Sequence, residues 1–251
     1  MQNTKADASE NILGGNFNSK KENQIWTSDI TYIWTKEGWL YSAVIMDIYS
    51  RKIVGWSLSS SLSAELVIKA LMMAILNRNP GAGLIVHSDR GSQYTSISVR
   101  NLLKNYQITQ SMSSTGNCYE NAITESFFHS IKTELIFGNS YQSREEAKRS
   151  IFEYIEVFYN RERLHSSLGY LSPVELKIKI RKELIEKVAQ LIVSFLGVKS
   201  NLKQKSVTVM PSRFFYCKCA IHQVRMSDTS DWFSLNRGFF LTLRKFGLDD
   251  I

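Results

Sequence analysis

The chain has 251 residues, enough for one sizeable core with appendages or for two small domains. Its 31 basic and 23 acidic side chains give a net charge of +8, so a polyanion is a plausible partner, although many basic proteins bind none. The composition excludes several classes. The longest apolar run, Val188–Val198, is too short for a membrane span, the first 25 residues lack a signal-peptide core, and the 3 cysteines are too few for a disulfide framework.

The first part of the chain predicts an irregular leader followed by three strands. Residues 1–24 are polar and rich in Asn, Lys and Ser, although Asn11–Leu13 and Phe17 could dock on the core. Alternating apolar residues and intervening turn residues then predict strands at Trp26–Trp34, Leu40–Asp47 and Lys52–Leu58. Asp47 ends the second strand, where aspartate favours a turn, so we interpret it as a structural residue.

The remaining elements alternate between helices and short strands. Apolar residues at helical spacing predict a helix at Ser63–Asn77, and the apolar run Leu84–Val86 predicts a buried strand that ends just before Asp89. A helix, a short extended segment and three further helices are expected at Ser96–Asn105, Gln107–Ser111, roughly 120–137, Arg144–Tyr159 and Lys177–Leu196. The pattern alone gives a mixed α/β fold.

Three carboxylates fall where these elements could bring them together. Asp29 lies on the first strand, Asp89 just past the end of a later strand, and Glu125 on the helix of residues 120–137, with 35 residues between Asp89 and Glu125. Carboxylate oxygens are the ligands that Mg²⁺ prefers, so the three acids could converge on a pair of divalent cations. Lys132, two helical turns after Glu125, would project from the same side of the helix.

Each acid also has a simpler interpretation. Taken singly, Asp29 in an alternating strand is usually solvated, Asp89 is equally credible as a turn former, and Glu125 could be an acid on a wet helix face. Any one of them alone is weak evidence. The three in order, with their flanking motifs, favour the metal site.

A resemblance to a known family rests on four segments taken together: Trp26–Ile33, His87–Ser96, Gly116–Glu134 and Tyr159–Glu175. They resemble the catalytic part of a DDE transposase of the insertion-sequence-three family, in its longer (OrfB) reading frame. The resemblance covers roughly residues 8–178. It implies a ribonuclease-H-like α/β fold, with a mixed sheet flanked by helices as in the catalytic core of retroviral integrases. It also implies a polynucleotidyl transferase that cleaves DNA and transfers strands during transposition, using two Mg²⁺ or Mn²⁺ ions.

The resemblance assigns roles to individual residues. Asp29, Asp89 and Glu125 would be catalytic and bind the metal ions, with Asp29 bridging both. Lys132 resembles the basic residue that the family places seven positions after its glutamate, which implies that it holds a terminal DNA phosphate. Further DNA contacts are expected from Gln93, Asn121, Arg161, Arg163 and His165. An equally good alternative for the last segment is that Asn160 and His165 anchor the turn against the core.

The predicted organisation is a leader at 1–24, a catalytic core at 25–178 and an unassigned extension at 179–251, which has no sustained periodicity beyond Gly197. The resemblance implies DNA as partner, both transposon ends and target, and a homo-oligomer on that DNA. It implies a bacterial cytoplasmic, nucleoid-associated protein without a membrane partner. No helix-turn-helix region is apparent before Trp26, so an upstream reading-frame product is expected to recognise the element ends.

Two rival functions are also compatible with the sequence. One is a ribonuclease-H-like nuclease that hydrolyses nucleic acid without joining strands, against which Lys132 and the segment Tyr159–Glu175 argue. The other is a non-enzymatic DNA-binding remnant of a truncated element. The unmatched extension favours that remnant, whereas the intact set of three acids opposes it.

Overall fold

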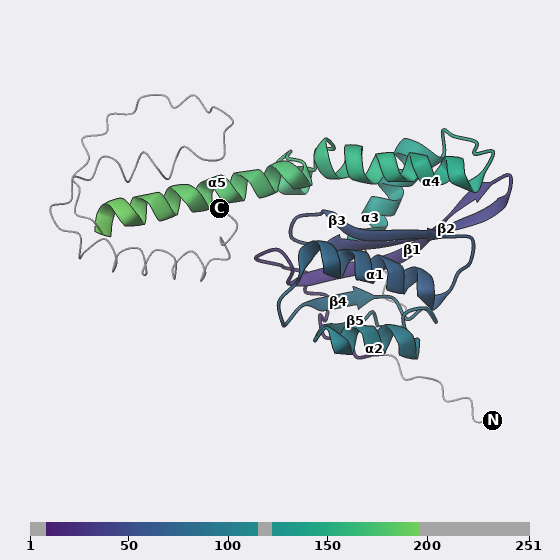
Figure 1. The fold of residues 1–251 in the computed structure, drawn as a ribbon, viewed down its shortest axis with the longest axis horizontal. Helices are drawn as coiled ribbons and strands as arrows, with labels where there is room; N and C mark the ends of the chain where they lie inside the picture. The colour runs from purple at the N-terminus through teal and green to yellow at the C-terminus, as the bar shows by residue number, and fades with distance from the viewer. Residues whose placement is uncertain (1–8, 115–121, 196–251) are drawn as a thin grey trace, which may run out of the picture. The chain divides into compact units, whose positions relative to one another are not determined.

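A five-stranded mixed sheet forms the centre of the fold (Figure 1). The computed structural model describes residues 9–114 and 122–195 of the chain. The strands are β1 (Ile25–Thr35), β2 (Gly38–Asp47), β3 (Ile53–Ser59), β4 (Ile85–Ser88) and β5 (Thr109–Met112), in the order β3-β2-β1-β4-β5. β1, β2 and β3 form an antiparallel meander, whereas β4 runs parallel to β1 and β5 parallel to β4. The predicted strands are confirmed, with ends that differ by only a few residues.

Helices cover both faces of this sheet (Figure 1). One face carries α1 and α2 and the other α3 and α4, with bounds Ala64–Arg78, Ile97–Asn105, Ala122–Ile131 and Arg144–Phe152. Each face has its own apolar core: Trp26 of β1 packs with Leu71 of α1, and Leu40 of β2 packs with Phe127 of α3. The mixed α/β fold expected from the pattern is confirmed.

Both helices on the second face continue as π-helical segments. Segment η2 (Lys132–Ile136) follows α3, and η3 (Glu153–Tyr159) follows α4. The helices expected over 120–137 and Arg144–Tyr159 are therefore confirmed in extent within the described residues, but not in type. A π-helical turn bonds residue i to i+5 and is frequent at functional sites, and here one begins at Lys132.

The close approach of α1 to β3 depends on a glycine. A Cβ atom at Gly55 would collide with the backbone of Ala70 and Ala74 in α1. Any larger residue at this position would therefore push the helix away from the sheet. Ser63 occupies the N-cap position of α1, but its side chain forms no capping hydrogen bond.

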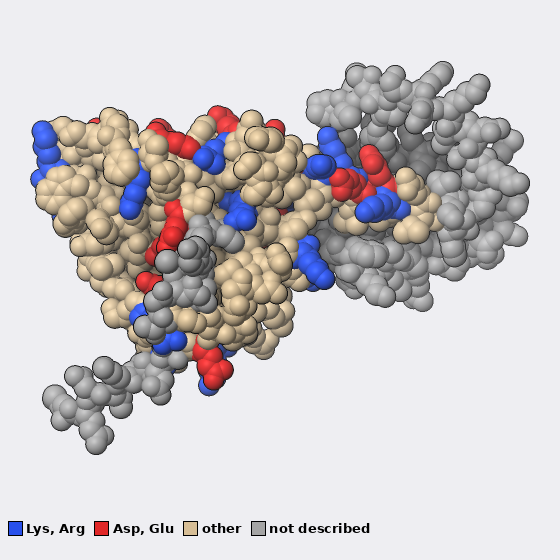
Figure 2. All heavy atoms as spheres, turned by 180° about the vertical axis from the view of Figure 1, so that it is seen from behind, with Lys and Arg blue, Asp and Glu red and all other residues tan. Residues whose placement is uncertain are grey.

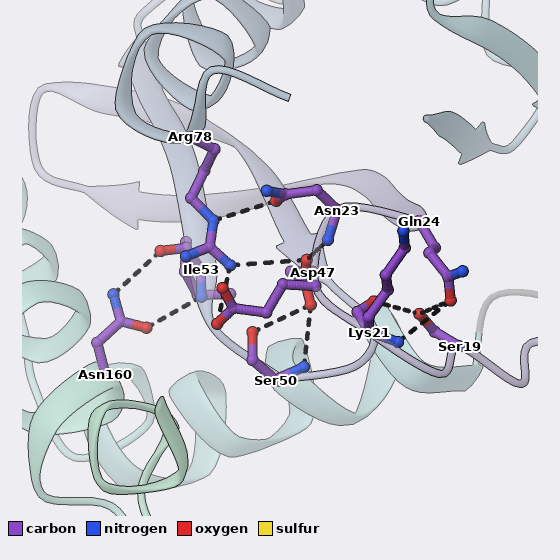
Figure 3. Close-up of polar contacts among 10 residues, drawn as sticks. Ser19, Lys21, Asn23, Gln24, Asp47, Ser50, Ile53, Arg78 and Asn160 are labelled. Carbon is purple, nitrogen blue, oxygen red and sulfur yellow. Dashed lines mark hydrogen bonds and ion pairs between the residues drawn. The ribbon is translucent and has the colours of Figure 1, made fainter. Parts of the chain in front are cut away.

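Asp47 is fully buried at the end of β2 and ties three segments together (Figure 3). One carboxylate oxygen accepts hydrogen bonds from the backbone N–H and the hydroxyl of Ser50, at 2.9 and 3.0 Å. The other accepts from the backbone N–H of Asn23 at 2.7 Å and lies 3.7 Å from the buried guanidinium of Arg78 at the end of α1. The structural interpretation of Asp47 is confirmed.

The leader docks along the outer edge of β5. The backbone N–H of Met112 donates to the carbonyl oxygen of Glu10 at 3.3 Å, and the ring of Phe17 packs edge-on against His87, with 5.3 Å between ring centroids. Docking of this segment, which the sequence left open, is confirmed. It covers an edge strand that would otherwise expose unpaired backbone groups.

A single helix, α5 (Pro173–Phe195), crosses the predicted boundary at residue 178. It starts with a capping box, in which the backbone N–H of Glu175 donates to the Ser172 hydroxyl and the backbone N–H of Ser172 donates to the Glu175 carboxylate. The helix expected at Lys177–Leu196 is confirmed as far as Phe195. Within residues 9–114 and 122–195, no helix is long and apolar enough to cross a bilayer.

Candidate active site

The parallel pairing of β1 with β4 brings Asp29 and Asp89 to one edge of the sheet. The last residues paired in this register are Thr27 on β1 and His87 on β4. Asp29 and Asp89 each lie two residues further along, so their carboxylates are neighbours where β4 ends. Among the strands that the structure describes, β2 alone pairs with β1 over Ser28–Trp34, so none of them lies along the other edge of β1 next to Asp29.

Asp29 occupies an unfavourable place for a negative charge. Burial raises the pKa of this carboxyl from 3.8 to about 6, against the opposing effect of the backbone N–H of Ile30, which donates to Oδ1 at 2.7 Å. The carboxylates of Asp89 and Glu125 contribute to this increase of the pKa, and Lys132 opposes it. A bound cation would relieve both the burial of the charge and the repulsion among the acids.

Helix α3 and η2 supply Glu125 and Lys132 to the same region. Glu125 is exposed in the first turn of α3, whereas Phe127 and Phe128 on the other side of the helix are buried in the core. Lys132 opens η2, and both side chains act electrostatically on Asp29. The structure therefore brings together the four residues that the sequence singled out first.

The loop after Asp89 is built around its carboxylate. The backbone N–H of Gly91 donates to Asp89 Oδ1 at 2.9 Å. A Cβ atom at Gly91 would lie only 2.9 Å from that oxygen and 3.1 Å from Oε1 of Gln93. A larger residue would push both groups aside, so the glycine keeps the carboxylate and the Gln93 amide beside each other.

Tyr94 joins this loop to β1, a role that the sequence reasoning missed. Its hydroxyl shares a hydrogen bond of 2.9 Å with the Ser28 hydroxyl, next to Asp29. Burial raises the pKa of Tyr94, so the phenol stays protonated at neutral pH. In the sequence, this role could have been inferred from the position of Tyr94, an aromatic residue in the polar segment that follows the end of β4. Tyr94 thus fixes the distance between the segments that carry Asp29 and Asp89.

Arg163 is engaged by the protein itself. Its guanidinium makes a two-pronged ion pair with Glu134 of η2, with Nη2–Oε1 at 2.7 Å and Nε–Oε2 at 3.0 Å, and Nη2 also donates to the Ser130 hydroxyl at 3.0 Å. Tyr154 donates to the same glutamate at 2.7 Å. These contacts fasten η2, which starts at Lys132, to η3 and to the segment that follows η3.

His165 and Asn160 anchor the turn that follows η3. Asn160 makes two hydrogen bonds to the backbone of Ile53, accepting at 2.9 Å and donating at 3.1 Å (Figure 3). His165 is 9% exposed, packs edge-on against Tyr159, and has a pKa lowered from 6.5 to about 4, chiefly by burial. A buried neutral imidazole is a poor phosphate ligand, so these contacts favour the anchoring alternative over DNA binding for His165.

The other predicted DNA contacts differ in their placement. Gln93 is half-buried beside Asp89, and Arg161 is exposed after η3. Asn121 lies outside the described residues. Figure 2 shows the face opposite to that of Figure 1, with a few acidic side chains gathered near its middle and lysine and arginine side chains spread around them.

The sequence is similar to those of known protein families. Two family profiles, both described as Integrase core domain, match residues 19–118 and 125–180. Transposase InsF for insertion sequence IS3A of Escherichia coli (strain K12) is 47% identical over 171 residues, 68% of this chain and 59% of that protein. The transposase for insertion sequence element IS904 of Lactococcus lactis is 46% identical over 167 residues, 66% of each. The chain thus spans about three-fifths of the length of the first relative.

The fold has a counterpart among solved structures. A chain in the cryo-EM structure of the simian T-cell lymphotropic virus intasome, in complex with PP2A regulatory subunit B56 gamma, matches with a TM-score of 0.51 and 15% identity. The match covers 76% of this chain and 60% of that one. At this identity the likeness concerns the fold alone, and it confirms the expected ribonuclease-H-like architecture.

Proposed function

Given that this chain belongs to the insertion-sequence transposases of the IS3 family, with an integrase core domain, we propose that it cleaves DNA and transfers strands during transposition. The convergence of Asp29, Asp89 and Glu125 on this fold carries the proposal. The chain spans 59% of the length of the InsF protein. We therefore also propose, by analogy, the complete reaction, its substrates and its partners.

We propose that Asp29, Asp89 and Glu125 hold two divalent cations, Mg²⁺ or Mn²⁺. Their oxygens are the hard ligands that such ions take, and the burial and repulsion that raise the pKa of Asp29 suit a site for positive charge. Among the residues that the structure describes, no three acidic, histidine or cysteine side chains already stand at metal-binding distance.

The chain's own residues position the DNA around this centre. Such ions, when bound, lower the pKa of the attacking hydroxyl and stabilise charge on the phosphate. Lys132 would bind a phosphate of the DNA end from the side of η2. Gln93, Asn121 and the exposed Arg161 would contact the backbone of the DNA. Tyr94 and Gly91 would hold Asp89 in place without touching the substrate.

The proposed partners are transposon-end DNA, target DNA and further copies of the same chain. A separate product of an upstream reading frame, with a helix-turn-helix region, would recognise the element ends. The net charge of +8 supports a polyanionic partner, and phosphate contacts of this kind weaken as salt rises.

A strand-joining assay tests the proposed function. A pre-cut, labelled oligonucleotide end is incubated with Mn²⁺ and target DNA, and the wild type is compared with Glu125→Gln. The matched control is Glu153→Gln, which neutralises an exposed glutamate on η3.

We expect joined products from the wild type and from Glu153→Gln, and none from Glu125→Gln. Cleavage without joining in the wild type would instead support a nuclease. DNA retention without any turnover would support a remnant. Equal activity in Glu125→Gln and the wild type would refute the assignment of the acids.

A further inference from the structure

Three large aromatic side chains are exposed together on the β1–β2 hairpin, which projects beyond α1 (Figure 1). Tyr32, Trp34 and Trp39 are 58%, 59% and 43% exposed. Trp39 packs edge-on against both other rings, with centroid distances of 5.1 Å to Tyr32 and 4.8 Å to Trp34. We call these three residues the aromatic cluster.

Packing within the hairpin accounts for only part of this arrangement. Trp34 and Trp39 are cross-strand partners, and such aromatic pairs stabilise antiparallel strands. On the same side of the sheet, the neighbouring Ile30 and Tyr41 are partly buried against the core. Mutual packing explains the contacts between the rings, but not why about half of each ring surface faces solvent. A contiguous exposed apolar patch of this kind marks an interaction surface.

The aromatic cluster meets the candidate active site at the edge of β1. Tyr32 lies three residues after Asp29 on this edge, so its side chain is on the opposite face of the sheet from the carboxylate of Asp29. Lys132 reaches across that edge, and its Nζ atom lies 5.7 Å from the centroid of the Tyr32 ring. A DNA strand with one phosphate on Lys132 would therefore have its neighbouring nucleotides over the aromatic cluster.

We propose that the aromatic cluster is a stacking platform for unpaired bases of the DNA end that the active site acts on. The inference rests on the proposed function for the identity of the DNA. Aromatic rings bind unpaired bases through their faces, without regard to sequence, in grooves whose cations hold the backbone. Here Lys132 would supply the cation, and Tyr32, Trp34 and Trp39 would supply the rings.

Charge and area both favour a DNA strand over a second copy of the chain. Lys36 is exposed at the hairpin turn, and Nε of Arg144 donates to the carbonyl oxygen of Trp39 at 3.1 Å. The nearby Glu37 accepts a hydrogen bond from the backbone N–H of Arg144 at 2.9 Å. Three half-exposed rings offer roughly 300 Å² of apolar surface, well below the ~800 Å² per partner of a standard protein interface.

Binding without metal separates this inference from the proposed function. The affinity of the chain for a labelled oligothymidylate is compared with its affinity for an abasic strand of equal length and charge, in EDTA. We expect the wild type to prefer the strand with bases by roughly tenfold. Trp34→Ala and Trp39→Ala should reduce this ratio to near one, while the dependence of affinity on salt stays unchanged, because the phosphate contacts remain.

Two controls address folding and location. Phe152→Ala removes an aromatic side chain that is 51% exposed on α4, outside the aromatic cluster, and should keep the preference for bases. Trp39→Phe retains an aromatic ring and the packing of the hairpin, so this variant should keep most of the preference for bases. Melting temperatures of all variants show whether the hairpin remains folded.

The inference would be overturned if the wild type bound the strand with bases no better than the abasic strand. It would also be overturned if Phe152→Ala lost this preference as fully as Trp39→Ala does. Self-association in sedimentation experiments that Trp39→Ala abolishes would overturn it too, because the patch would then bind a second copy. Base preference together with inactive strand joining would overturn the proposed function and leave the platform in place.

Discussion

Two aspartates on adjacent strands, Asp29 on β1 and Asp47 on β2, have opposite surroundings. Asp47 is fully buried, and its oxygens accept three hydrogen bonds, with Arg78 close by (Figure 3). Asp29 accepts one backbone hydrogen bond and has Asp89 and Glu125 as charged neighbours. A carboxylate whose oxygens are satisfied holds the fold together, whereas a carboxylate held beside other acids is suited to bind a cation.

The same contrast separates the two arginines after η3. Arg163 is paired with Glu134 and Ser130, so it contributes to the framework behind Lys132. Arg161, two residues earlier, is exposed. Side chains that the protein already engages are therefore candidates for stability, and those that it leaves at the surface are candidates for DNA contact.

The largest expected effect comes from neutralising Asp29. Asp29→Asn should reduce strand joining by more than about a thousandfold, or about 4 kcal/mol, because a ligand of the proposed metal site is lost. The folded state should not be weakened, since the change removes a buried charge. The gel assay and thermal melting measure the two quantities. A variant that joins strands at the wild-type rate would show that Asp29 is no ligand.

Asp47→Ala should show the reverse pattern. The free energy of unfolding should fall by about 3 kcal/mol, because the change leaves the backbone N–H groups of Asn23 and Ser50 without their acceptor and removes one of the two carboxylates beside the buried guanidinium of Arg78. Strand joining per folded molecule should stay near the wild-type value. Urea denaturation and the joining assay at low temperature test this. Unchanged stability would mean that the Asp47 network contributes nothing net.

Arg163→Met and Arg161→Met sharpen the comparison between the two arginines. Loss of the partly exposed pair with Glu134 should lower the free energy of unfolding by about 1–2 kcal/mol. Arg161→Met should leave stability unchanged and reduce the salt dependence of DNA binding by about one counterion. If Arg163→Met instead changes only the salt dependence, the DNA-binding assignment of Arg163 holds after all.

A further effect is a pH dependence of stability without metal. An acid whose pKa is raised in the folded state binds more protons there than when unfolded, so its stabilising effect is present below pH 3.8 and lost as the pH rises to about 6. Asp29→Asn should therefore be more stable than the wild type by about 3 kcal/mol at pH 7 and equally stable near pH 3.5. Denaturation at a series of pH values measures the difference. If the difference in stability between Asp29→Asn and the wild type were the same at every pH, the pKa of Asp29 would not be raised in the folded state.

Much of the fold was predictable because its signals are local. Alternating and helical apolar patterns located the strands and helices, and Asp47 before Tyr49–Arg51 indicated a turn. The positions of Asp29, Asp89 and Glu125 also followed from pattern and resemblance, and the structure places these acids in one region. Their roles in metal binding and catalysis remain predictions.

The features that could not be predicted from the sequence depend on contacts between distant segments. The link from Tyr94 to Ser28 spans 66 positions, and the pair of Arg163 with Glu134 spans 29. Neither has a local pattern, because both arise only when the helices dock on the sheet. The aromatic cluster was hidden for a similar reason, since alternation predicts a strand but not which aromatic residues lie beyond the covering helix.

Crystals grown with Mn²⁺ and a pre-cut DNA end would test the proposed metal site most directly, through the anomalous scattering of manganese. We expect two manganese peaks bound by the carboxylates of Asp29, Asp89 and Glu125, with a DNA phosphate on Lys132. DNA bound at this edge of the sheet with saturating Mn²⁺ and no peak at Asp29 would contradict the proposed site.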